Sequence, residues 1–495
     1  MATSELLPLY DLIAKCNRCG FCQAGCPVFR VTGEEHSLAR GRLAVARGLM
    51  LGNLELTPEV IHALEDCLLC RGCTAHCFPA LKTDEVVTAI RHAYITRHGQ
   101  PAWQRILFRS ILSDSKKLET AGRMALWAKR NGLATLAEKS GILNLVDKRL
   151  AVANQVVPPM TAKPFLRGEH ARVPTPAQTK HRVGYFVSCG FSFQFPEVVE
   201  ATLRVLARNG CAITVLDNTC CGRPAQSYGD VEAARDIAKK NVDRLAPGMG
   251  LDAILSECGS CSTHLKDYGS LLRGDPAYAE KASALSKKVQ SFSEFLVGIN
   301  ANGSLGTLTG TITYHDPCHL SNRFAKITAQ PRKLLKAIPG ATYTELPEAD
   351  WCCGAAGSYT FLHHSEAVGV LDRKMGNVEK TGATILATEC PACMMHLSYG
   401  VKRRGLPVQV RHVSQLLDQA YAAAIEQWAY HFLQSAVAVN LIRASTSEYG
   451  HDSLPQCKSN VHCQSIAANY KLALVHVIGK LDDGFALLEE LRSVS

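Results

Sequence analysis

The chain has 495 residues, of which 47% are hydrophobic and 20% are charged. These values exclude a disordered or fibrous protein, and the length exceeds what one hydrophobic core usually supports, so we expect about two to four domains. Most of the net charge of +10 lies in residues 97–182, with 16 Lys or Arg against 5 Asp or Glu. This basic segment is either a solvated helix face or a docking surface for an acidic partner subunit or an anionic membrane.

The N-terminal segment MATSELLPLYDLIAKC has no basic stretch followed by an apolar one, so no secretory signal is visible. We therefore expect a cytoplasmic protein. No run approaches the roughly 20 apolar residues of a membrane-spanning helix. Any membrane contact is expected to be peripheral, at the inner face, and we predict no nucleic-acid partner.

The 21 cysteines are the unusual feature of the composition, and most of them stand in CxxC or CC pairs. Disulfide frameworks belong to small secreted domains without a sufficient core. Paired cysteines in a large intracellular chain are more typical of thiolate metal ligands. The pattern therefore favours metal centres.

Residues 1–96 are predicted to form an α-helical domain, with apolar residues at helical spacing in 37–51. The region holds two cysteine runs of the form CxxCxxCxxxC, the pattern of dicluster ferredoxins with two [4Fe-4S] clusters. Three thiolates of one run wrap one cluster, and the fourth cysteine reaches the neighbouring cluster. On this logic one cluster takes Cys16, Cys19, Cys22 and Cys77, and the other takes Cys26, Cys67, Cys70 and Cys73.

Zinc is the alternative occupant, because thiolates at CxxC spacing also form tetrahedral zinc sites. Eight cysteines in two runs of four match the cluster pattern much better. Pro27 directly follows the first run, whereas the second run ends Cys77-Phe78-Pro79. The displaced proline is expected to alter the loop and not the ligation.

Residues 97–180 are predicted to be a basic amphipathic helix to about 150, followed by a proline-rich linker over 156–176. A domain boundary is expected near residue 180. Beyond about 426 the composition changes, and the tail 426–495 stays unassigned. It holds only Cys457 and Cys463, and residues 472–491 have a helical pattern.

Strands are predicted at 183–187, 212–216 and 252–255, alternating with helices that begin near 196 and 230. The same order recurs with strands at 311–315 and 383–387. The spacing from Cys189 to Cys318 is 129 positions, and the pairs Cys220/Cys352, Cys258/Cys390 and Cys261/Cys393 are each 132 apart. We infer an internal duplication that forms two α/β domains with parallel-type sheets, over 181–300 and 301–425, with the cysteines at strand ends.

The cysteine motifs of the two copies are TCCGRP and ECGSC in the first, and DPCHL, WCCG and ECPAC in the second. Together with the dicluster pattern they resemble the CCG domains of heterodisulfide reductases and of the iron–sulfur subunits of glycolate and lactate oxidases. The resemblance implies one or two further [4Fe-4S]-type clusters, of noncubane form in the heterodisulfide reductases. Their ligands would be Cys189, Cys220, Cys221, Cys258 and Cys261 in the first copy, and Cys318, Cys352, Cys353, Cys390 and Cys393 in the second.

Some other residues near these motifs have simpler interpretations. Cys211 follows Gly210 at the entry to a strand and is predicted to be a packing residue. His264, His315, His319 and His396 border the cysteines. They are expected either to fix loops, or to donate hydrogen bonds to cluster sulfur or pass protons. None is predicted to be a ligand.

No GxGxxG motif after a strand and no phosphate loop is present, so a flavin is expected on another chain. The resemblance then implies an electron-transfer subunit of a flavin-dependent glycolate or lactate dehydrogenase. It would pass electrons from an FAD-containing partner to a quinone or another carrier. No acid or base catalyst is required of this chain.

Three alternatives remain open from the sequence. A heterodisulfide-reductase-like subunit would reduce a disulfide at a CCG-bound cluster, with Arg223 beside Cys221 as a candidate for binding an anionic substrate. The two complete cysteine sets favour this reading. Anaerobic glycerol-3-phosphate dehydrogenase uses a similar subunit. The last alternative is a zinc-stabilised scaffold.

Overall fold

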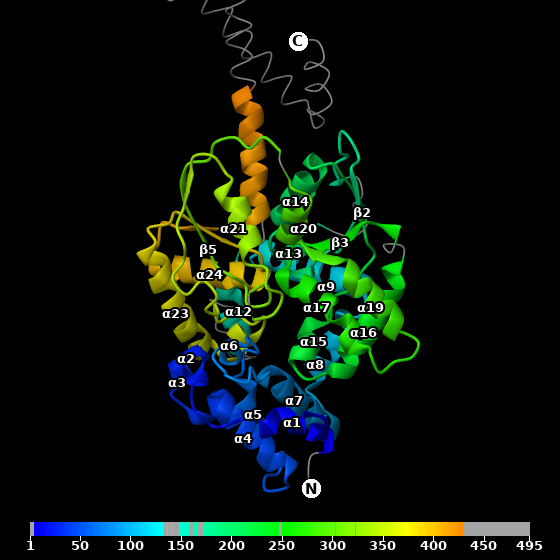
Figure 1. Cartoon of the computed structure of the whole chain (residues 1–495), viewed down its shortest axis with the longest axis vertical. Coiled ribbons are helices and arrows are strands. Elements are labelled where there is room, and N and C mark those ends of the chain that lie inside the picture. Colours follow the sequence, from blue (N-terminus) through cyan, green and yellow to red (C-terminus); the bar gives the residue numbers. More distant parts are fainter. Residues whose placement is uncertain are drawn as a thin grey trace, which may run out of the picture.

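The structure is a computed structural model that describes residues 4–132, 136, 140, 148–158, 163–165, 172–246, 250–301, 303–321 and 323–428. Helices form its N-terminal part, and two four-stranded parallel sheets follow, each with helices around it (Figure 1). This is the α/β class expected from the sequence. Cys457, Cys463 and the helix expected at 472–491 lie outside the described residues.

The N-terminal part contains only helices among its described residues, as predicted. They are η1 (Ser4–Leu9), α1 (Tyr10–Ala14), α2 (Cys22–Gly25), α3 (Phe29–Thr32), η2 (Glu35–Ser37), α4 (Ala39–Met50), α5 (Pro58–Glu65), α6 (Gly72–Ala75) and α7 (Thr83–His98). Leu43, Leu49, Leu64 and Ile90 form part of their common core. The short helices α2 and α6 cross so closely at Gly25 and Gly72 that a side chain at either glycine would meet the backbone of the other. This crossing brings the two N-terminal cysteine runs together.

The basic segment does not form the continuous helix that its pattern predicts. It contains α8 (Ala102–Ile106), a π-helical turn η3 (Leu107–Ile111), α9 (Ser115–Arg130) and α12 (Lys148–Val156). The chain breaks before α9 because the Asp114 side chain accepts a hydrogen bond from the Lys117 backbone N–H at 3.0 Å and caps a new helix. The Phe193 ring occupies the space that a side chain at Gly122 would take, so α9 packs closely on the first α/β unit.

The first sheet has the strand order β2-β1-β3-β4, with all neighbours parallel. Its strands are β1 (His181–Tyr185), β2 (Cys211–Val215), β3 (Ala253–Ser256) and β4 (Val289–Ser291). The helices are α13 (Cys189–Gln194), α14 (Pro196–Arg208), α15 (Arg223–Ser227), α16 (Val231–Arg244), α17 (Gly259–Lys266), α18 (Tyr268–Leu271), α19 (Ala279–Lys288) and α20 (Phe292–Gly298). The three predicted strands are present within two residues of their expected bounds.

The second sheet repeats this topology in the order β6-β5-β7-β8. Its strands are β5 (Gly310–Tyr314), β6 (Ala341–Tyr343), β7 (Ile385–Thr388) and β8 (Gln409–His412). The helices are α21 (Ala329–Lys336), α22 (Tyr359–Leu362), α23 (His364–Lys380) and α24 (Pro391–Arg404). The identical order of four parallel strands confirms the internal duplication.

The two α/β units share one interface, in which the cysteine-bearing loops of both copies meet. Val183 and Leu255 of the first sheet lie in the same apolar cluster as Ile312 and Ala387 of the second. The backbone N–H of Gly259 donates to the Glu389 carbonyl across the interface at 2.9 Å. In parallel α/β sheets ligands gather beyond the carboxyl ends of strands, and this interface places two such ends face to face.

Candidate metal centres

Four of the predicted N-terminal ligands gather in the interior. Cys26 and Cys70 are buried. Cys26 lies close enough to Cys67 and Cys70 to interact with them electrostatically, and Cys73 lies close enough to interact with all three. Burial raises the pKa of the Cys26 thiol to about 11. The buried ion pair between Arg42 and Asp66, with 2.7 Å between Nη2 and Oδ1, lies beside this group. The positive charge of Arg42 opposes the effect of burial on Cys26.

The other four N-terminal cysteines, of which Cys22 is buried, include the one most exposed to solvent. Cys16 interacts with Cys22, and Cys16 and Cys77 pack against the same helical core. Cys19 is exposed to solvent. This group therefore forms the outer of the two N-terminal thiol groups.

The cysteines of the second copy form a buried group at the carboxyl ends of β5 and β7. The Sγ atoms of Cys353 and Cys393 are 3.4 Å apart, and Cys352 interacts with both Cys318 and Cys353. Cys390 and Cys393 interact at the start of α24. Five thiols within one buried site suit a metal cluster better than isolated packing cysteines.

The first copy has the same arrangement at the carboxyl ends of β1 and β3. Cys220 interacts with Cys189 and Cys221, and Cys261 interacts with Cys221 and Cys258. Gly222 and Gly354 follow the CC pairs with φ of +91° and +88°. The turn at Gly354 needs glycine for two reasons. Its backbone is in the left-handed conformation, and a side chain there would collide with the Ala367 carbonyl.

The four thiol groups form a connected series, in which Cys22 of the outer group shares a buried cluster with Cys26 and Cys70 of the inner group. The Cys70 thiol of the inner N-terminal group interacts with Cys352 of the second copy. The Cys390 thiol of the second copy interacts with Cys258 of the first. These thiol contacts connect the N-terminal groups to the first copy through the second, a connection that spacing alone did not predict.

Arg323 lies at the junction between the inner N-terminal group and the second copy. Its side chain is 3% exposed and its Nη2 is 3.1 Å from Oδ2 of Asp350. The charges of Cys70, Cys352 and Cys318 act on its guanidinium. Its Nε and Nη1 find no hydrogen-bond partner among the described residues, so a buried positive charge faces both sites.

The cysteines of both copies and Cys67 of the inner N-terminal group line one cavity of about 890 Å³, which extends towards α5 and α7. On its wall Arg223 Nη2 lies 3.0 Å from His319 Nε2, and His319 Nδ1 lies 2.8 Å from Ser260 Oγ. Ser260 Oγ in turn lies 3.6 Å from the sulfur of Cys390. Burial lowers the pKa of His319 to about 3, so this imidazole is neutral at pH 7.

The other histidines near the motifs differ in their contacts. His264 and His396 are fully buried at equivalent positions, and His396 Nδ1 lies 2.9 Å from the Cys353 carbonyl oxygen. His315 has a ring nitrogen within 4.8 Å of the sulfurs of Cys353 and Cys393. Cys211 lies in the apolar core away from these groups, as predicted.

Two buried tyrosine–glutamate pairs support the CxxC motifs and were not identified from the sequence. The Tyr185 hydroxyl donates to Glu257 at 2.6 Å, and the Tyr314 hydroxyl donates to Glu389 at 3.1 Å. Burial raises the pKa of both carboxyl groups to about 7. Each glutamate directly precedes a cysteine, so the 132-residue repeat could have revealed the pair.

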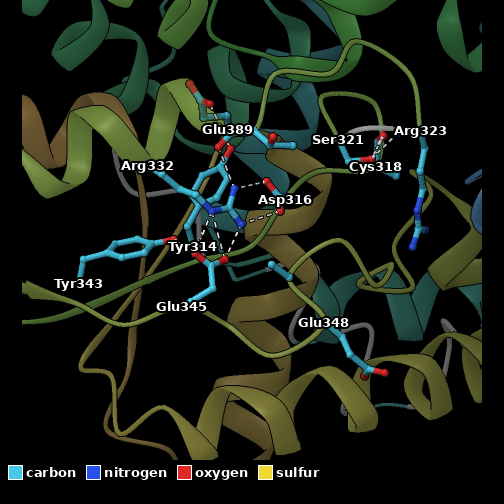
Figure 2. A network of polar contacts seen from close by, with 12 residues as sticks. Tyr314, Asp316, Cys318, Ser321, Arg323, Arg332, Tyr343, Glu345, Glu348 and Glu389 are labelled. Atoms are coloured by element: carbon cyan, nitrogen blue, oxygen red, sulfur yellow. Dashed lines mark hydrogen bonds and ion pairs between the residues drawn. The ribbon is translucent and has the colours of Figure 1, made fainter. Parts of the chain in front are cut away.

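A salt-bridge network anchors the loop that carries Cys318 (Figure 2). Arg332 donates to both carboxylate oxygens of Asp316 at 2.8 Å, and its Nε donates to Glu345 Oε2 at 2.9 Å. The Ser321 hydroxyl donates to the Cys318 carbonyl at 2.8 Å. The network fixes the loop two residues before the cysteine.

We expect Arg332→Ala to lower the free energy of unfolding by about 2–3 kcal/mol. Removing Arg332 leaves the buried Asp316 carboxylate without its counterion, and the partial exposure of Arg332 keeps the loss below that of a fully buried pair. Urea denaturation under anaerobic conditions measures the free energy of unfolding. Arg235→Ala is the control, because its exposed pair with Glu232 should contribute less than about 0.5 kcal/mol. Equal losses in the two variants would contradict this role.

The residues present fit iron–sulfur clusters. Cysteine thiols gather in the N-terminal part and in each copy, and buried polar atoms around them, including both ring nitrogens of His264 and His315, have no hydrogen-bond partner among the described residues. Thiolates are the ligands of such clusters, and neighbouring donors commonly bond to their sulfurs. The donor set is therefore suited to clusters.

Comparison with known proteins gives the family. Residues 13–80 match the 4Fe-4S dicluster domain, and residues 183–266 and 312–398 each match the cysteine-rich CCG domain. Residues 99–157 match the linker region of the glycolate oxidase iron–sulfur subunit. The probable glycolate oxidase iron–sulfur subunit of Bacillus subtilis (strain 168) is 30% identical over 419 residues, covering 82% of this chain and 94% of the relative. The chain belongs to the glycolate oxidase iron–sulfur subunit family.

Other relatives agree with this assignment. The glycolate oxidase iron–sulfur subunit of Escherichia coli (strain K12) is 26% identical over 83% of this chain and 94% of its own length. Lactate utilization protein A of Geobacillus kaustophilus (strain HTA426) is 30% identical over 48% of this chain and 98% of its own length. The chain is thus an iron–sulfur subunit of an oxidoreductase. No helix in the part of the chain that the structure describes is long and apolar enough to cross a membrane.

Proposed function

We propose that the chain is the electron-transfer subunit of a flavin-dependent dehydrogenase that oxidises glycolate or lactate. The substrate class comes from the names of its relatives. The observation that supports conduction is the connected series of four thiol groups, from the group with exposed Cys19 to the buried first copy. Bound clusters would supply one-electron oxidation and reduction along this series.

The proposed ligands follow the grouping of the thiols. The outer N-terminal centre uses Cys16, Cys19, Cys22 and Cys77, and the inner centre uses Cys26, Cys67, Cys70 and Cys73. The two CCG centres use Cys189, Cys220, Cys221, Cys258 and Cys261, and Cys318, Cys352, Cys353, Cys390 and Cys393. The corresponding domains are 1–96, 181–300 and 301–425, with 97–180 as a connecting segment.

An experiment with the substrate tests this function. The full chain is purified anaerobically with a co-expressed FAD-containing partner subunit, and glycolate or lactate is added while cluster signals are followed by low-temperature electron paramagnetic resonance (EPR). We expect reduction of the clusters only when the flavoprotein and its substrate are both present. Clusters that stay oxidised with either 2-hydroxy acid, although dithionite reduces them, would overturn the proposed function.

We propose that the flavoprotein docks at the outer centre. Phe21, two residues after exposed Cys19, is 66% exposed, and Phe78, next to Cys77, is 93% exposed; Lys15 and Arg18 stand in the loop of Cys19. Exposed aromatic side chains within a positively charged loop suit an acidic protein surface. Electrons leave at the other end of the series for a quinone or another carrier, with the protein peripheral to the membrane.

Phe78→Ala should slow reduction by the flavoprotein about tenfold, the loss expected for an aromatic residue at the centre of an interface. Stopped-flow kinetics measures the rate at several ionic strengths. Trp127→Ala is the matched control, since this side chain on α9 is also exposed, at 61%. A slower rate in the Trp127 variant alone would place the docking surface on the basic segment instead.

The cavity favours a second candidate function, reduction of a small disulfide. Cysteines of both copies line this cavity, and Arg223 and His319 lie on its wall. Titration of the oxidised protein with a disulfide, followed by EPR, separates the two functions. A new signal that disappears in Cys353→Ser or Cys221→Ser would support the disulfide reductase, and indifference to the disulfide would support conduction.

A further inference from the structure

His315 is the first residue after β5 and is 1% exposed. Neither of its ring nitrogens has a hydrogen-bond partner among the described residues. One of these nitrogens lies within 4.8 Å of the sulfurs of both Cys353 and Cys393. A neutral imidazole carries one N–H donor and one acceptor nitrogen, and burying a donor without a partner is unfavourable.

The first copy has no nitrogen at this position. The spacing of 129 residues relates the starts of β1 and β5 and also Cys189 and Cys318, so Phe186 is the counterpart of His315. Phe186 is fully buried and has no polar atom in its side chain. The two copies therefore offer the same five cysteines but different surroundings for them.

Arg323 also places a positive charge beside the second copy, and substitutions at His315 and Phe186 leave that charge unchanged. His396 has an equivalent in His264, and Gly354 has an equivalent in Gly222. The Cys353 carbonyl already lies 2.9 Å from His396 Nδ1, whereas the Cys353 sulfur lies within 4.8 Å of a His315 ring nitrogen.

We propose that His315 donates an N–H hydrogen bond to the Cys353 thiolate, so that the centre of the second copy has a higher reduction potential than that of the first. The proposal rests on the proposed function, because it requires a cluster in each copy. Hydrogen bonds to cluster sulfur stabilise the more negative, reduced state. The copy that contacts the N-terminal group would thus be the easier of the two to reduce.

An exchange of the two equivalent residues tests this inference. His315→Phe gives the second copy the residue of the first, and Phe186→His gives the first copy the residue of the second. Redox titration with EPR should show a lower midpoint potential for one CCG centre in His315→Phe and a higher one for the other centre in Phe186→His. His315→Gln, which retains an N–H donor, should restore part of the potential.

Pulsed EPR with 15N-labelled histidine gives an independent readout. We expect a weak nitrogen coupling at one CCG centre that disappears in His315→Phe. Unchanged potentials and couplings in both exchange variants would overturn the inference, and so would a strong coupling that indicates a direct iron–nitrogen bond. The iron content of each sample is measured first. If the CCG sites of the unaltered chain contain no iron, the proposed function itself is refuted. If the iron content is normal and the spectra are unchanged, only the role of His315 is refuted.

Discussion

Cys353→Ser should remove the centre of the second copy and also prevent electrons that enter at the N-terminal end from reaching the first copy. Cys353 lies between these two ends, since its group contacts Cys70 on one side, through Cys352, and Cys258 on the other, through Cys390. Cys221→Ser should remove only the first-copy centre, which terminates the series. In each variant the iron content should fall by about four atoms per chain.

Rapid freeze-quench EPR after reduction by the flavoprotein measures this asymmetry. The signal of the first copy should fall to background in Cys353→Ser, and the signal of the second copy should persist in Cys221→Ser. Cys211→Ser is the control, because Cys211 is equally buried but lies in the apolar core away from the four groups. Normal reduction of the first copy in Cys353→Ser would contradict the order of the series.

Arg323→Gln should lower the midpoint potentials of the inner N-terminal centre and of the second-copy centre together. The buried guanidinium is positioned to stabilise the negative charge added to either site on reduction. Two unit charges about 8 Å apart interact by about 2 kcal/mol at an effective dielectric constant of about 20. This energy corresponds to a shift of about 90 mV for a one-electron couple.

Redox titration of the full chain measures both potentials in one experiment. Arg235→Gln serves as the control, because this exposed arginine on α16 pairs with Glu232 on the surface and should leave the potentials unchanged. A shift confined to one of the two centres, or no shift in Arg323→Gln, would contradict the position assigned to this charge between the sites.

The sequence predicted the elements that local patterns encode. Strands such as 183–187 and 311–315 have enough apolar residues to be recognised, and the repeated cysteine spacing revealed the duplication. The edge strands β4 and β8 were missed, because each contains a single apolar residue, Val289 and Val410, which is too few to show a strand pattern. The helix expected over 97–150 was too long, because its amphipathic pattern did not account for the cap at Asp114.

The relation between the domains could not be predicted from spacing. Both copies carry the same cysteine motif, so nothing in the motif indicates that Cys352, and not Cys220, meets Cys70. The same limit applies to Arg323, which belongs to no repeated motif and acquires its role only from the contact between two domains. These positions depend on packing between residues far apart in the chain. Such packing leaves no periodic pattern in a single sequence.

The most direct test of the account is the iron and acid-labile sulfide content of anaerobically purified full chain, with Mössbauer spectroscopy to identify the cluster types. Four centres predict about 16 iron atoms per chain. About half would give cubane spectra, and the rest would belong to the two CCG sites. A content of about eight iron atoms, all in cubane clusters, or stoichiometric zinc with little iron, would contradict a conducting series through both copies.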